Sequence, residues 1–83
     1  MANKQTILDY KEYDIDDLLS GLLYLNIKHV ISRTQLKTIE RLCKPELPAF
    51  VELKQRTPKG LINVWINGVE KYQVNTRAKL IYK

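Results

Sequence analysis

The sequence predicts an α+β domain in which two amphipathic helices pack on a small antiparallel β-meander. Two observations support this fold class. Residues 14–44 carry two apolar patterns with helical spacing, and an Asn-Gly pair separates two alternating runs between residues 61 and 74. With 83 residues, 45% of them hydrophobic and 28% charged, the chain is expected to form one compact domain spanning residues 1–83.

The first helix is predicted to begin at Asp14, a good N-cap residue, with Asp17 at N3 beside the positive end of the helix dipole. At about 100° per residue, its apolar residues fall within one arc of roughly 160°. They are Ile15, Leu18, Leu19, Leu22, Leu23 and Leu25. Asn26 lies in the middle of this face, so we expect the helix to end there.

The second helix is predicted to begin with a capping box, in which Ser32 and Gln35 satisfy each other's backbone N–H groups. Pro45 should stop the helix at about Lys44. The expected buried side consists of Leu36, Ile39, Leu42 and Cys43.

Residues 47–56 allow two interpretations. As a strand, Ala49, Val51 and Leu53 alternate with more polar residues, and a type I turn over residues 57–60 follows, which favours this interpretation. As a helix, Pro48 would occupy N1. The segment would then be a recognition-type helix in a winged-helix-like architecture, with three helices and a β-hairpin wing.

Asn67-Gly68 predicts a type I′ turn that joins strands over residues 61–66 and 69–74, since both central residues of that turn need positive φ. This turn sets Ile66 opposite Val69, and further along it sets Val64 opposite Lys71 and Asn63 opposite Tyr72. A last strand is expected at Ala78–Tyr82.

The hairpin can present either face to the core. If Ile62, Val64, Ile66 and Val69 face the core, Trp65 and Tyr72 point outward together. If the sheet is turned over, Trp65 and Tyr72 become core residues. The four aliphatic residues favour the first orientation.

No catalytic or metal site is expected. One histidine, His29, and one cysteine, Cys43, cannot build a structural zinc site, and a single cysteine forms no internal disulfide. The three glycines stand apart, so no phosphate-binding loop is present. Capping explains Asp14 and Asp17, and solvation explains Asp16. We therefore predict a protein that is not an enzyme and has no cofactor.

The expected compartment is cytoplasmic, or at least intracellular, because a small secreted domain would ordinarily need disulfides. Residues 1–17 hold no continuous apolar run of the kind found in signal peptides. The longest apolar stretch, residues 18–25, is too short to span a bilayer. No membrane association is predicted.

The charge is unevenly distributed along the chain. The formal net charge is +5, but residues 1–30 carry three lysines against five acids, whereas residues 31–83 carry eleven basic residues against four acids. A basic region of this kind favours a polyanionic partner. The expected polyanion is DNA or RNA.

Two groups of residues are candidates for such contacts. The first lies in the second helix and repeats at i, i+4, i+8 and i+11 over about 16 Å. It consists of Arg33, Lys37, Arg41 and Lys44. The second combines cations with aromatic rings in the β-region, as in sheets that bind single strands. It consists of Lys54, Arg56, Lys59, Lys71, Arg77, Lys79, Trp65 and Tyr72.

Two functions are therefore expected from different classes. The first is non-enzymatic nucleic-acid binding, with regulation as one role. The alternative is a protein-interaction module, such as a small inhibitor or adaptor of a larger protein, anchored by Trp65, Tyr72 and Phe50. A thin core with an apolar face to share also makes a homodimer an option.

Overall fold

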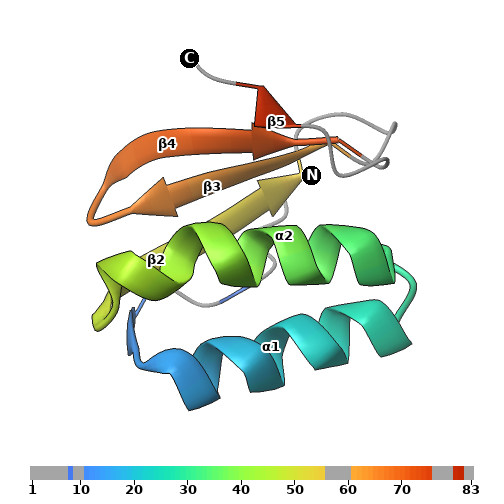
Figure 1. Ribbon diagram of the computed structural model, residues 1–83, viewed down its shortest axis with the longest axis horizontal. Helices are drawn as coiled ribbons and strands as arrows, with labels where there is room; N and C mark the ends of the chain where they lie inside the picture. The colour runs from blue at the N-terminus through green and yellow to red at the C-terminus, as the bar shows by residue number, and fades with distance from the viewer. Residues whose placement is uncertain (1–7, 9–10, 56–60, 76–79, 82–83) are drawn as a thin grey trace, which may run out of the picture.

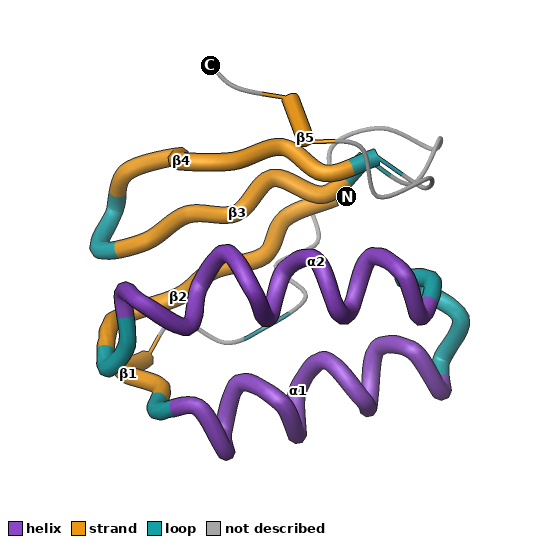
Figure 2. Tube along the Cα trace, viewed as in Figure 1, coloured by secondary structure: helices purple, strands orange, loops and turns teal. Residues whose placement is uncertain are grey.

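A computed structural model shows the predicted architecture, with two helices on one face of an antiparallel sheet (Figures 1 and 2). It describes residues 8, 11–55, 61–75 and 80–81. The elements are β1 (Lys11–Tyr13), α1 (Ile15–Ile27), α2 (Arg33–Cys43), the 3-10 turn η1 (Lys44–Glu46), β2 (Ala49–Gln55), β3 (Ile62–Ile66), β4 (Val69–Val74) and β5 (Leu80–Ile81).

The five strands lie in the order β1-β2-β3-β4-β5, and each neighbouring pair is antiparallel. The helical hairpin α1-α2 carries the chain from β1 back to the adjacent strand β2 (Figure 1). β1 was not predicted from the sequence. β5 falls within the expected last strand, whose remaining residues, like the turn expected at 57–60, lie outside the described residues.

Both predicted helix caps are confirmed. The Asp14 side chain accepts a hydrogen bond from the backbone N–H of Asp17 at 2.9 Å. The backbone N–H of Gln35 donates to Ser32 Oγ at 3.1 Å, and that of Ser32 donates to Gln35 Oε1 at 2.9 Å, which completes the capping box. α2 ends at Cys43, before Pro45, as expected.

α1 ends in a Schellman motif rather than at Asn26. The Val30 N–H donates to Leu25 O at 2.9 Å and the His29 N–H donates to Asn26 O at 3.0 Å, while His29 has φ 64°. Asn26 is tolerated near the end of the helix because its side-chain amide donates to Ile31 O. The helix therefore continues to Ile27, one residue beyond the prediction.

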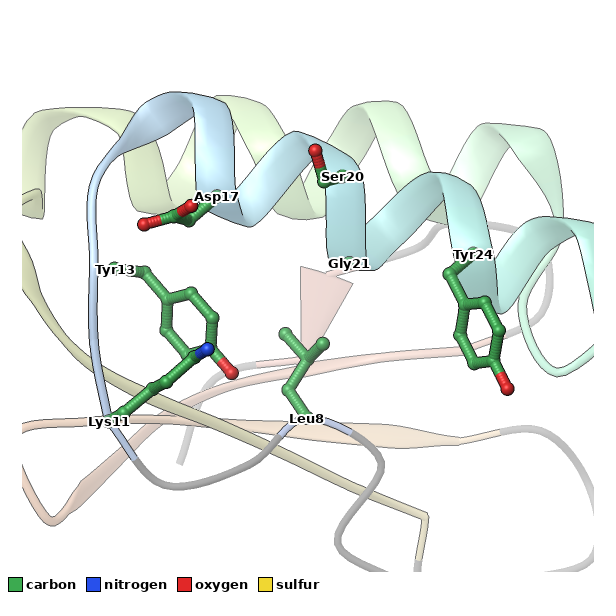
Figure 3. Close-up of a pocket in the computed structure, with 7 residues that line it drawn as sticks. All are labelled: Leu8, Lys11, Tyr13, Asp17, Ser20, Gly21 and Tyr24. Atoms are coloured by element: carbon green, nitrogen blue, oxygen red, sulfur yellow. The ribbon is translucent and has the colours of Figure 1, made fainter.

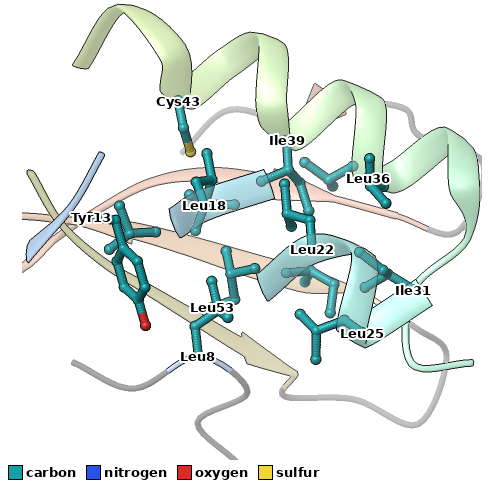
Figure 4. Packing of buried hydrophobic residues seen from close by; sticks show 14 of the residues in the cluster. Leu8, Tyr13, Leu18, Leu22, Leu25, Ile31, Leu36, Ile39, Cys43 and Leu53 are labelled. Atoms are coloured by element: carbon teal, nitrogen blue, oxygen red, sulfur yellow. The ribbon is translucent and has the colours of Figure 1, made fainter. Parts of the chain in front are cut away.

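The core fills the space between the helix pair and the sheet (Figure 4). Leu18, Leu22, Leu36, Ile39 and Val64 were expected at its centre, and all five are buried. Two apolar residues expected to be buried in the core are exposed. Leu23 is 48% exposed and Val69 is 59% exposed. Leu23 lies at one edge of the wide apolar arc of α1, and Val69 sits beside the hairpin turn.

Residues 49–55 form a strand, so the winged-helix alternative with a third helix is wrong. Ala49, Val51 and Leu53 alternate into the core, and β2 pairs with β1 on one side and β3 on the other. A segment with a buried period of two and a partner on each edge satisfies its backbone hydrogen bonds as a strand. The helical spacing of the apolar residues around Pro48 therefore does not make this segment a helix.

The hairpin turn is as predicted, but the register beyond it is not. Asn67 and Gly68 have φ 53° and 83°, and Ile66 pairs with Val69. Further along, Val64 pairs with Tyr72 rather than Lys71, and Asn63 pairs with Gln73. The cause is a β-bulge in β4, where Lys71 is an extra residue between Glu70 and Tyr72.

The bulge reverses the expected orientation of Tyr72. Residues directly opposite each other in an antiparallel pair point to the same face, so Tyr72 shares the face of the buried Val64 and packs against the core. Trp65, one residue along from Val64, points to the face without helices. Trp65 and Tyr72 do not face outward together, which corrects the prediction.

Candidate nucleic-acid interface

The four cations predicted on the second helix, Arg33, Lys37, Arg41 and Lys44, which we call the α2 stripe, lie on the solvent side of that helix. Arg33, Lys37 and Arg41 belong to α2 and Lys44 is the first residue of η1, and all four side chains are exposed. At 100° per residue the four fall within an arc of about 80°. The opposite side of α2 is buried and carries Gln35, Leu36, Thr38, Ile39 and Cys43. The fold therefore gathers these four cations on one surface.

The charges of the α2 stripe are not neutralised by neighbouring acids in the described part of the chain. The two ion pairs found there involve other cations: Lys54 with Glu52 at 4.0 Å, and Lys71 with Glu46 at 3.2 Å. Glu40, half-buried, is the one acid within α2. Four like charges on one helix face repel one another modestly, and a bound anion would relieve that repulsion.

The anchoring of α2 keeps the stripe in place. The Gln35 side chain is 1% exposed and donates from Nε2 to Val74 O in β4 at 3.3 Å, which ties the first turn of the helix to the sheet. The capping box fixes the same turn from the other side. The sequence indicates the cap but not this bridge to β4, since a glutamine at N3 gives no sign of a second partner.

Lys54 and Lys71 are the β-region cations in the described part of the chain, and they lie at different places on the sheet. Lys54 lies on the sheet face without helices, with Nζ 4.4 Å from the ring centroid of Trp65. Lys71 is exposed at the bulge and pairs with Glu46. The other four predicted cations, Arg56, Lys59, Arg77 and Lys79, lie outside the described residues.

The aromatic platform expected on the sheet does not form as predicted. Trp65 is half-buried beneath Lys54, and Tyr72 lies on the opposite face. Phe50, which is 42% exposed, shares the helix-free face with Lys54 because the two positions in β2 differ by an even number. The patch of Trp65, Tyr72 and Phe50 expected for a protein partner is divided in the same way.

The helix-free face also holds a residue that the sequence did not single out. Asn63 is 1% exposed, and within the described part of the chain both polar atoms of its amide lack a hydrogen-bond partner, as does Trp65 Nε1. A buried amide without partners costs free energy, roughly 1–3 kcal/mol. The alternation of β3 indicates an outward Asn63 but gives no sign that neighbouring side chains cover it.

The single cysteine and the single histidine of the chain lie in the core and in a turn, respectively. Cys43 is fully buried, and this burial, with a smaller effect from the negative charge of Glu46, raises the pKa of its thiol to about 12. His29 is exposed in the turn that ends α1. Among the described residues, no three His, Cys, Asp or Glu side chains are grouped so as to hold a metal ion.

In the parts of the chain that the structure describes, neither helix is long and apolar enough to cross a bilayer. The chain matches no protein-family model, no curated protein sequence and no solved structure. Any functional conclusion must therefore come from the surfaces described above.

Proposed function

We propose that the protein binds nucleic acid, without catalysing a reaction on it, through phosphate contacts made by the α2 stripe. The observation that carries the proposal is the gathering of four exposed cations on one arc of a helix, with no ion-pair partner among the described residues. Nucleic acids are the polyanions that such a linear array of charge fits best.

The geometry favours contacts along a phosphate backbone. From residue 33 to residue 44 the stripe spans about 16 Å at 1.5 Å per residue. Because α2 packs against both α1 and the sheet, one side of the helix is free. A helix held in this way contacts phosphates from one side, and these contacts provide affinity and register but little sequence preference.

The charge of the whole chain supports the same function. A net charge of +5 attracts any polyanion over a distance of about 8–10 Å at physiological salt. The α2 stripe would then convert this general attraction into contacts, each of which releases counterions from the nucleic acid. Regulation is one role that such binding would serve.

A matched pair of charge reversals tests the proposal. Lys37→Glu removes a cation at the centre of the stripe, whereas Lys71→Glu removes an exposed cation on β4, and both change the net charge by the same amount. Fluorescence anisotropy with labelled single- and double-stranded DNA and RNA at low salt should show about a three- to tenfold loss for Lys37→Glu. Lys71→Glu should have the smaller effect.

Two outcomes would contradict the proposal. An equal loss for both variants would mean that net charge alone drives binding, and would contradict an interface on α2. The absence of binding by the wild-type protein to all four probes at low salt would exclude the proposed function. Circular dichroism of both variants would establish that the fold is intact, which is expected because both side chains are exposed.

A further inference from the structure

The solvent side of α1 carries an apolar patch that the monomer leaves uncovered. Leu23, Tyr24 and Ile27 are 48%, 57% and 72% exposed. They lie in the second half of the helix, and all three point away from the buried side formed by Leu18, Leu22 and Leu25. Exposed apolar residues grouped in this way are typical of an interaction site.

A pocket adjoins this patch towards the start of the same helix (Figure 3). It has a volume of about 390 Å³ and is lined by Leu8, Lys11, Tyr13, Asp17, Ser20, Gly21 and Tyr24. Gly21 lets Leu8 pack closely against α1 in the pocket wall, since a Cβ atom at Gly21 would lie 2.5 Å from Leu8 Cδ2. Tyr24 belongs to both the patch and the pocket, so the two form one continuous surface.

The distance along α1 between Ile27 and the pocket fits contact with a second copy of the chain. Ile27 lies seven residues after Ser20, which is about 10.5 Å along the axis and nearly the same angular position on the helix. Two α1 helices packed antiparallel about a two-fold axis near Leu23 and Tyr24 would place Ile27 of each copy over Ser20 of the other. An isologous contact of this kind uses the same surface twice.

Charge complementarity supports the same arrangement. The first turn of α1 carries Asp16 and Asp17, and Lys28 caps the other end of the helix. In the antiparallel pair, Lys28 of each copy would approach the edge of the pocket formed by Asp17 of the other. Lys11 also lines the pocket, with Nζ 5.4 Å from the ring centroid of Tyr13, and Lys28 Nζ lies 5.6 Å from the ring centroid of Tyr24.

We propose that the chain forms a homodimer in which the two α1 helices pack antiparallel, with Ile27 and Lys28 of each copy entering the pocket of the other. This interface is separate from the α2 stripe, so the dimer and nucleic-acid binding can be tested independently of each other. Its centre is Leu23, Tyr24 and Ile27, and its rim is Asp17 and Lys28.

Sedimentation equilibrium of the full chain, without nucleic acid and over a concentration series up to about 200 μM, tests the dimer. The wild-type protein should approach twice the mass of the 9.7 kDa chain. Ile27→Glu should raise the dimer dissociation constant by on the order of a hundredfold, because a charge enters both pockets. Val69→Glu, at an exposed valine on the hairpin, is the matched control and should leave the constant unchanged.

A charge swap tests the antiparallel orientation. Lys28→Glu alone should weaken the dimer by about tenfold because it places a carboxylate beside Asp17. Adding Asp17→Lys should recover part of this loss. A swap that recovers nothing would contradict the arrangement. A wild-type chain that stays monomeric at every concentration would overturn the proposal, and the apolar patch would then be a site for a different protein. A dimer that survives Ile27→Glu would also overturn it.

Discussion

The two helices of this protein resemble each other on their buried sides and differ on their exposed sides. α1 and α2 lie next to each other on one face of the sheet, and each begins at a capped N-terminus (Figure 2). The exposed side of α2 is polar and carries the α2 stripe. The exposed side of α1 begins with two acids and ends with three large apolar side chains.

This difference shows which residues of each helix take part in the packing of the monomer and which do not. For α2, the buried residues account for its attachment to the core, and its exposed cations remain without a structural role. For α1, packing uses Leu18, Leu22 and Leu25 but leaves Leu23, Tyr24 and Ile27 in water. We therefore assign different partners to the two surfaces, a polyanion to α2 and a second copy of the chain to α1.

The largest effect is expected at two adjacent leucines of α1. Leu22→Ala should lower the free energy of unfolding by roughly 3 kcal/mol, because Leu22 is fully buried and its removal leaves a cavity. Leu23→Ala, measured at a concentration where the chain is monomeric, should change it by less than about 0.5 kcal/mol. Urea titration followed by circular dichroism measures both, and similar losses would mean that both sides of α1 pack inside the monomer.

The N3 residues of the two helices provide a second comparison. Gln35→Ala should cost about 2 kcal/mol, because it removes half of the capping box and the bond to Val74 O, and leaves a buried void. Asp17→Ala should cost roughly 0.5 kcal/mol, since Asp17 is exposed and acts mainly through the helix dipole. Thermal unfolding of both variants at equal concentration tests this order, and a larger effect at Asp17 would reverse it.

The junction between the helices should respond in the opposite direction. His29 occupies the C′ position with φ 64°, where a side chain is strained and glycine is not. His29→Gly should therefore raise the free energy of unfolding by about 0.5–1 kcal/mol. A matched His29→Ala variant keeps the strain and should show no such gain. If both variants are equally stable, the backbone conformation of this turn does not limit stability.

The smallest change in stability is expected from the ionisation of Cys43, on the buried side of α2. Burial keeps the Cys43 thiol protonated, with its pKa raised to about 12, so iodoacetamide should modify it only when the protein unfolds. Since the folded pKa lies above the unfolded value, stability from this group is complete below about pH 8.5 and declines above it. Mass spectrometry after alkylation at pH 7.5 with and without urea checks this, and rapid modification of the native protein would contradict it.

Much of the fold followed from local signals in the sequence. The caps at Asp14 and Ser32 and the turn at Asn67-Gly68 depend on residues a few positions apart, and all three were predicted. β1 was not predicted, because three residues carry no recognisable period and the strand is defined by its pairing with β2.

The candidate sites were likewise predictable where they depend on local sequence, and not where they depend on the assembled fold. The α2 stripe requires only helical periodicity, and its four residues are indeed exposed together. The orientation of Tyr72 depended on a bulge at Lys71, which the alternation of residues does not reveal. The exposure of Leu23 depended on how much of α1 the sheet and α2 cover, and this is a property of the assembled layers.

The most direct test of the central claim is the salt dependence of nucleic-acid binding. With four phosphate contacts from the α2 stripe, the logarithm of the binding constant for double-stranded DNA should fall with the logarithm of salt concentration with a slope of about −3.6. The variant Arg33→Glu/Lys37→Glu/Arg41→Glu should bind every probe more weakly, with a slope reduced in magnitude by up to about 3. Neutralising Glu12 and Asp16, which lie outside the stripe, should change little. A wild-type slope near zero, or a triple variant with the wild-type slope, would contradict the account.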